Sequence, residues 1–179
     1  EPIHIEDMAQ VRGFYPERKY HGSFETIAAL IYRGQDSAGL REFARRMTFN
    51  ILIGNGDAHL KNWSLIYLNP RKPTLAPAYD LVSTTVYQPN QYQPEDLGLK
   101  FGNSKRFDSV RISTFDRLEQ KLGIRAELSE IARETIDLVT REWPRAESIL
   151  SVDKSLVDSI RAFIKARAHQ LCRKQNTGS

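Results

Sequence analysis

The fold is decided by "FNILIGNGDAHLKNWSL", residues 49–65, in which a hydrophobic run gives way to a dense polar segment. Gly54 and Gly56 tolerate the positive φ that ends a helix, so the run before them reads as the end of a helix. An acid, a histidine, a lysine and an asparagine follow at Asp57, His59, Lys61 and Asn62. The aromatic and branched residues after them predict a strand. We therefore expect a polar loop where a helix meets a β-hairpin.

Length and composition limit the classes of protein to which this chain can belong. A chain of 179 residues suits one domain, or one lobe of a larger protein. Its net charge of +4 is mild: it favours an anionic ligand such as a phosphate but falls short of a nucleic-acid footprint. The single cysteine, Cys172, excludes an internal disulfide and fits a reducing cytoplasm. No apolar run is long enough to span a bilayer and no signal peptide is visible, so we expect no membrane partner.

Apolar spacing and capping residues predict helices before the polar loop. Ile5, Met8 and Val11 are spaced for a first helix that stops at Gly13, so the first residues read as helical. Ser23 is an N-cap candidate for the next helix, "FETIAALIYRG". The longest helix begins at Asp36 or Ser37, carries an apolar stripe through Leu52, and ends near Gly54.

The segments after the loop complete a mainly α fold with one small β-hairpin. "WSLIYL" is the first strand of that hairpin, and "TLAPAYDLVS" returns as a short second strand that Pro77 weakens. Residues 87–107 are rich in Gln, Pro, Asn and Gly and read as a long loop. The remainder is helical, with Ser113 or Thr114 as a cap, a helix that stops before Pro144, and a closing helix from Ser155.

The spacing of Asp57 and Asn62, with four residues between them, is that of the catalytic loop in protein kinases. One tight loop there aims a carboxylate at the attacking hydroxyl and an amide oxygen at magnesium. A second carboxylate is needed to hold magnesium between the nucleotide phosphates. Asp80 follows the hairpin and can fold back beside Asn62. These residues together predict half of a phosphoryl-transfer site.

Each of these residues also has an ordinary structural explanation. Asp57 alone is most often a turn former, and Asn62 a turn or cap residue. His59 could be a core histidine, Lys61 a solvated charge, and Asp80 a surface acid or N-cap. The D-x-x-x-x-N pattern by itself occurs often by chance. The full set with its intervening hairpin is a far less common coincidence and favours a site.

"NILIGNGDAHLKNWSL" followed by "LAPAYDLVSTT" resembles the HipA-like serine/threonine kinases, the toxins of bacterial toxin–antitoxin pairs. The opening "HIEDMAQVRGFYPERKYHGSF" also resembles the start of the C-terminal lobe in that family. The resemblance covers nearly the whole chain. It implies that residues 1–179 form one helical C-terminal lobe of a kinase-like fold, whose hairpin carries a catalytic loop at 54–62 and a metal-binding segment at 76–84.

The resemblance also implies roles for individual residues. It makes Asp57 the catalytic base, and Asn62 and Asp80 the ligands of the Mg²⁺ that accompanies ATP. His59 and Lys61 belong to the same catalytic motif, His59 ordering the loop and Lys61 approaching the phosphates or the substrate. The acceptor it implies is a protein serine or threonine, with aminoacyl-tRNA synthetases among the family's targets. The partner it implies is a helix-turn-helix antitoxin, through which any DNA contact is indirect.

One departure from the family pattern leaves alternatives open. Such kinases need an N-terminal lobe with a strand lysine and a loop over the phosphates, and no glycine-rich phosphate loop followed by a β-rich segment occurs here. We therefore expect the ATP-grasping lobe to be absent from this chain, and the chain alone to bind ATP poorly. An alternative is a kinase-like module that has lost catalysis and binds an antitoxin or another protein. A nucleic-acid-binding protein is a weaker alternative, since no helix-turn-helix, zinc or aromatic-platform signature is present.

Overall fold

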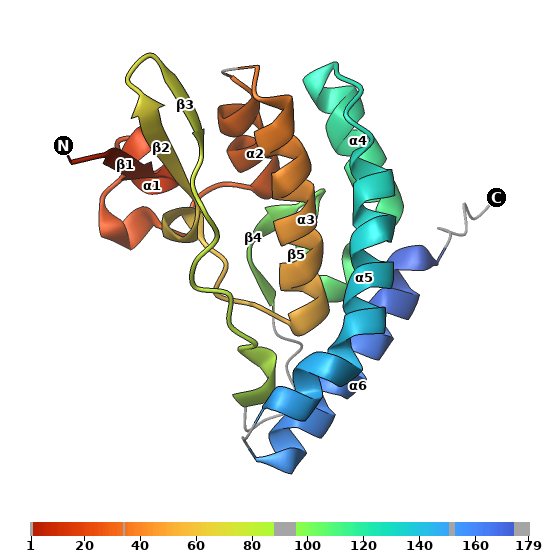
Figure 1. Cartoon of the computed structure of the whole chain (residues 1–179). Coiled ribbons are helices and arrows are strands. Elements are labelled where there is room, and N and C mark those ends of the chain that lie inside the picture. Colours follow the sequence, from red (N-terminus) through yellow and green to blue (C-terminus); the bar gives the residue numbers. More distant parts are fainter. Residues whose placement is uncertain (1, 34, 88–95, 151–152, 174–179) are drawn as a thin grey trace.

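The computed structural model describes residues 2–33, 35–87, 96–150 and 153–173, and Figure 1 shows their arrangement. A small sheet lies on one side of helix α3, and helices α5 and α6 lie on the other (Figure 1). The mainly helical class that the sequence predicts is confirmed. The helices are α1 (Met8–Val11), α2 (Phe24–Tyr32), α3 (Ser37–Ile53), α4 (Ile112–Leu122), α5 (Leu128–Ile149) and α6 (Lys154–Cys172). No helix in the described ranges is both long and apolar enough to cross a membrane.

The remaining regular elements are short strands and 3₁₀ helices. The strands form a three-stranded antiparallel sheet in the order β1-β2-β3 and a separate two-stranded sheet, β4-β5. The strands are β1 (His4–Asp7), β2 (Ser64–Asn69), β3 (Lys72–Leu75), β4 (Asp96–Phe101) and β5 (Ser104–Arg106). The 3₁₀ helices are η1 (Pro16–Arg18), η2 (Leu60–Asn62), η3 (Thr85–Tyr87) and η4 (Phe107–Ser109).

Helix α3 is the central element, and both of its predicted ends are confirmed. The Asp36 carboxylate caps its N-terminus by accepting a 2.7 Å hydrogen bond from the Gly39 amide. Gly54 ends it in the left-handed conformation, with φ of 68°. The apolar stripe of α3 is fully buried between α2, α5 and α6. The predicted cap of α2 is also confirmed, because the Ser23 hydroxyl accepts from the Thr26 amide.

The first helix begins later than the sequence predicts. His4–Asp7 form strand β1, which pairs with β2 from Ser64 to Tyr67, so the expectation that the first residues are helical is wrong. Ile5 sits in this strand with half of its side chain exposed, whereas Met8 is fully buried. The Asp7 carboxylate then caps α1 by accepting from the Gln10 amide. Strand pairing therefore overrides the helical spacing of Ile5 and Met8.

The expected long loop at residues 87–107 is also wrong in its second half. Residues 96–106 form the β4-β5 hairpin, and residues 88–95 lie outside the described residues. Leu97, Leu99 and Phe101 alternate along β4 and are buried in the core. The described residues thus form two small sheets instead of one hairpin. "TLAPAYDLVS" contributes to β3 only up to Leu75, before Pro77.

Two predicted boundaries among the C-terminal helices are also corrected. Helix α4 begins at Ile112, so neither Ser113 nor Thr114 is its N-cap. Instead, the Thr114 hydroxyl accepts from the Arg111 amide within the first turn. Helix α5 runs through Pro144 to Ile149. Pro144 cannot donate to the carbonyl of Thr140, but Thr140 is exposed and water can hydrate that group.

Gly54 and Gly123 have the same backbone conformation but different surroundings, so a comparison of the two positions distinguishes backbone strain from side-chain crowding. Both end a helix at nearly the same φ, 68° and 67°. A Cβ at position 54 would overlap Thr85 Oγ1 and lie 2.7 Å from Phe163 Cε1, whereas one at 123 meets nothing within 4 Å.

Gly54→Ala is therefore expected to destabilise the protein more than Gly123→Ala. Both variants should lose about 1 kcal/mol of unfolding free energy to the left-handed backbone. Gly54→Ala should lose about 1–3 kcal/mol more through crowding. Urea unfolding measures both values, and equal losses in the two variants would show that packing around Gly54 is not tight.

Candidate active site

The polar loop, residues 54–62, runs from the end of α3 to the start of β2 and is held by a buried asparagine. The Asn55 side chain is 2% exposed. Its amide nitrogen donates to Asn50 Oδ1 in α3 at 2.8 Å, and its oxygen accepts from the Asp57 amide at 3.1 Å. Asn55 was not among the predicted site residues, because an asparagine between two glycines is typical of a simple turn.

Asn62 and Asp80 meet, although 18 positions separate them in the sequence. The Asn62 carboxamide donates to Asp80 Oδ2, and its own oxygen accepts from the His59 amide at 3.1 Å. Asp80 has a φ of 56°, an uncommon left-handed conformation for a residue other than glycine. Asn55 Nδ2 donates to the Asp80 carbonyl at 3.3 Å. The two side chains that the sequence predicts as magnesium ligands are therefore in direct contact.

The segment after Asp80 lies along the polar loop and is hydrogen-bonded to it repeatedly. The Ser83 hydroxyl donates to the Ile53 carbonyl at 2.5 Å. The Thr84 hydroxyl accepts from the Gly56 amide at 2.8 Å, and the Thr84 amide donates to the Gly54 carbonyl at 3.2 Å. The backbone that carries Asp80 is thus held by Asn55 at the Asp80 carbonyl and by Ser83 and Thr84 after it.

Asp57 presents a half-exposed carboxylate, with 51% of the side chain accessible. The Tyr20 hydroxyl donates to its Oδ1 at 2.5 Å. This hydrogen bond, together with burial and the nearby negative charge, raises the pKa of Tyr20 to about 12. Tyr20 was not predicted, because it lies 37 positions earlier in an ordinary polar segment. The sequence offers no local signal for the contact.

His59 is buried beside this pair. Its ring meets the Tyr20 ring edge-on at 5.2 Å between centroids, and its Nε2 lies 3.9 Å from Asp57 Oδ1. Burial lowers the pKa of His59 below 6.5, and the positive charge of Lys19 acts in the same direction against the opposing charge of Asp57. The imidazole is therefore neutral at pH 7. Its Nδ1 is buried and has no hydrogen-bond partner among the described residues.

Lys61 has an exposed side chain, and its backbone carbonyl is bonded to the segment that contains Asp80. The Tyr79 hydroxyl donates to the Lys61 carbonyl at 2.7 Å and lies 2.5 Å from the Ser64 hydroxyl. Partial burial raises the pKa of Tyr79. Tyr79 precedes Asp80 directly, so this contact joins the backbone before Asp80 to the end of the polar loop. The ammonium group of Lys61 makes no ion pair within the described ranges.

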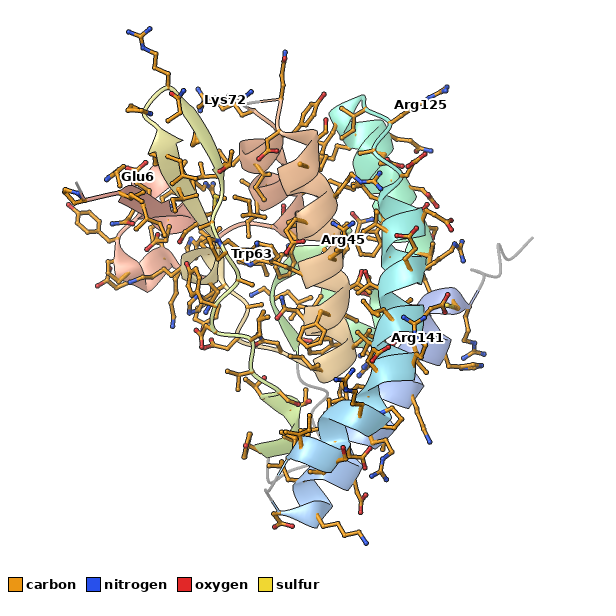
Figure 2. The ribbon with its side chains drawn as sticks, in the orientation of Figure 1. Glu6, Arg45, Trp63, Lys72, Arg125 and Arg141 are labelled. Carbon is orange, nitrogen blue, oxygen red and sulfur yellow. The ribbon has the colours of Figure 1, made fainter. Side chains whose placement is uncertain are left out.

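The polar loop is also supported by the hydrophobic core and by strand β4. Trp63 follows it directly and lies beside α3 (Figure 2), with its ring 5.1 Å from that of Phe43 and 6.1 Å from that of Phe24. The backbone of β4 passes so close that a Cβ at Gly98 would lie 2.7 Å from the Ala58 carbonyl oxygen. Only glycine fits at that position without displacing the loop. Gly98 was missed because its segment was expected to be irregular.

The donor set at Asn62 and Asp80 fits magnesium. Both residues offer oxygen, which is the ligand type Mg²⁺ prefers, and protein sites commonly supply only one or two carboxylates beside nucleotide phosphates and water. Among the described residues no cluster of three or more His, Cys, Asp or Glu side chains exists, so the chain builds no closed metal cage there. The Asn62 oxygen accepts one hydrogen bond, from His59, and keeps a second lone pair for a cation.

Comparison with known proteins places this geometry in a family context. Residues 1–143 match the profile of the family described as the HipA-like C-terminal domain. The protein named "Putative kinase Y4dM" from Sinorhizobium fredii is 39% identical over 164 residues, which are 88% of this chain and 38% of that protein. "Serine/threonine-protein kinase toxin HipA" from Shewanella oneidensis is 32% identical over 113 residues, covering 50% of this chain and 24% of that protein.

The fold is also found in a solved structure. A chain from the Shewanella oneidensis MR-1 complex of HipA, HipB and operator DNA matches 94% of this chain with a TM-score of 0.78. The sequences are 22% identical, so this likeness shows a shared fold. The match covers 43% of that chain, and the present chain likewise spans less than half the length of the relatives above.

The depressed pKa of His59 predicts an acid-sensitive fold. In the unfolded chain His59 takes up its proton near pH 6.5, but in the folded protein burial resists protonation until lower pH. Stability should therefore be complete above pH 6.5 and should fall as the pH drops below it. His59→Gln should flatten this slope, whereas His169→Gln, at an exposed position, should not. Urea unfolding across this pH range tests the prediction, and an unchanged slope in His59→Gln would contradict it.

Proposed function

The chain belongs to the HipA-like C-terminal domain family, and from this membership we propose that it is the catalytic lobe of a protein serine/threonine kinase. The proposed reaction transfers the γ-phosphoryl group of ATP to a protein hydroxyl. The observation that carries the proposal is the contact between Asn62 and Asp80. Asn62 lies five positions after Asp57, whose carboxylate is accessible. The kinase names of two relatives support it.

Each residue has a part in the proposed reaction. Asp57 accepts the proton of the serine or threonine hydroxyl as the new oxygen–phosphorus bond forms and the bond to ADP breaks. Asn62 and Asp80 would hold Mg²⁺, which offsets the negative charge of the phosphates when it is bound. Lys61 carries a free positive charge in the same loop and is suited to a phosphate or a charged substrate group. His59 is neutral and buried, and orders the loop.

The proposed acceptor and partner follow from the relatives. The acceptor class is a protein serine or threonine, and the family resemblance makes an aminoacyl-tRNA synthetase the first substrate to assay. One solved relative is in complex with HipB and operator DNA. We propose that this chain likewise belongs to a protein with an antitoxin partner, in the cytoplasm, and that its contact with DNA is indirect.

Substitutions at Asp57 and Asp80 separate the two chemical roles in the full gene product. Asp57→Asn should reduce phosphoryl transfer by roughly 10²–10⁴-fold and leave nucleotide binding intact, because the carboxamide cannot accept the proton. Asp80→Asn should weaken magnesium-dependent ATP binding. Calorimetry measures the binding, and transfer of labelled phosphate measures the reaction.

Asp137→Asn is the control for both variants, because Asp137 is an exposed acid on α5 and belongs to neither proposed role. It should leave binding and transfer unchanged. Transfer at the wild-type rate by Asp57→Asn would refute the proposed base. ATP binding that is indifferent to both magnesium and Asp80 would refute the proposed metal site.

The indirect DNA contact gives a second prediction. The chain alone should not shift operator DNA in a gel, because its excess positive charge is only +4. A co-expressed helix-turn-helix partner should bind the DNA and carry the chain with it. A shift by the chain alone that weakens steeply with salt would instead favour direct nucleic-acid binding.

A further inference from the structure

The orientation of the proposed base depends on a single hydrogen bond. Asp57 Oδ1 accepts from the Tyr20 hydroxyl at 2.5 Å, and His59 Nε2, at 3.9 Å, is beyond hydrogen-bonding distance. Within the described ranges no group donates to the second oxygen, Oδ2. The side chain is half exposed and gains little restraint from packing. Without Tyr20 the carboxylate would therefore be free to rotate.

The backbone on both sides of Tyr20 is hydrogen-bonded, and on one side the bond is to the polar loop. The residue before it, Lys19, accepts a 3.1 Å hydrogen bond from the Leu60 amide, which joins the two backbones beside the phenol. The Tyr20 ring packs edge-on against the buried His59 ring, and the Lys19 ammonium lies 4.9 Å from the ring centroid. On its other side, the His21 carbonyl accepts from the Arg12 guanidinium at 2.9 Å. The phenol is therefore a fixed donor.

We infer that Tyr20 is a positioning residue that pins one oxygen of Asp57 and so directs the other toward the acceptor hydroxyl. The inference rests on the proposed function and adds to it the hydrogen bond that orients the base. Proton transfer requires the base within hydrogen-bonding distance of the acceptor. A small misplacement of a catalytic group can cost up to about a hundredfold in rate, so a single well-placed hydroxyl can matter greatly.

A second role for the same contact would be inhibitory. The Tyr20 hydroxyl could occupy the place of the acceptor hydroxyl and have to leave before the reaction. Two observations favour positioning: Oδ2 has no donor among the described residues, and both backbone neighbours of Tyr20 are tethered. The two roles predict opposite effects of removing the hydroxyl, so one variant distinguishes them.

The test is Tyr20→Phe in the full gene product, which keeps the ring on His59 and removes only the hydroxyl. We expect kcat for phosphoryl transfer to fall about tenfold or more while KM for ATP stays within about twofold. Tyr15→Phe is the matched control, because Tyr15 is 78% exposed and its hydroxyl has no partner in the described part of the chain. An unchanged or increased kcat in Tyr20→Phe would overturn the inference.

A double-mutant cycle then distinguishes positioning from general loss of structure. If Tyr20 acts only through Asp57, adding Tyr20→Phe to Asp57→Asn should cause no further loss of activity. Losses that multiply would mean that Tyr20 acts elsewhere and would overturn the inference. Thermal unfolding of each variant shows whether the fold is retained.

A measurement that needs no activity keeps the inference testable if Tyr20→Phe fails to fold. The Tyr20 phenol should ionise at about pH 12 in the wild type and at lower pH in Asp57→Asn, as followed by tyrosinate absorbance. No change between the two would overturn the contact itself. Full phosphoryl transfer by Asp57→Asn would instead overturn the proposed function, even with the titration as expected, so the two failures are distinguishable.

Discussion

The buried carboxamide of Asn55 is the contact on which the rest of the site depends, because it joins three separate stretches of backbone. It donates to Asn50 in α3 and to the carbonyl of Asp80 in the returning segment, and it accepts from the amide of Asp57 in the loop. A buried amide left without partners costs about 1–3 kcal/mol. The Asn55 side chain therefore holds the backbones of Asp57 and Asp80 close to the end of α3.

Behind this polar network lies a rigid apolar support. Trp63, Phe24, Phe101 and Phe115 form a chain of edge-to-face ring contacts, with centroids 5.2 to 6.1 Å apart, that crosses from the loop to α4. Such packing fixes ring positions more strictly than apolar burial alone. The backbone of β4 closes the remaining space at Gly98. The functional groups thus stand on a loop whose base cannot shift without disturbing the core.

In the proposed site, exposed charged groups that a ligand could reach are separated from the buried histidine of the loop. Asp57, Lys61 and Asp80 are exposed, whereas His59 is buried and neutral. The left-handed backbone of Asp80 is tolerated because hydrogen bonds on both sides of it fix the segment. Strain of this kind is often found at functional sites, where the surrounding structure holds it in place.

The sequence by itself determined the features that are encoded within a few neighbouring residues. Asp36 and Gly54 fix the ends of α3 through a cap and a left-handed turn, and the spacing of Asp57 and Asn62 marks the loop. Only the tertiary structure decided the contacts that join distant segments. These include the pairing of β1 with β2, the approach of Gly98 to Ala58, and the Tyr20 hydroxyl on Asp57. The physical reason is that caps and turns satisfy local hydrogen bonds, whereas strand partners and the neighbours of a carboxylate are chosen by the packing of the whole chain.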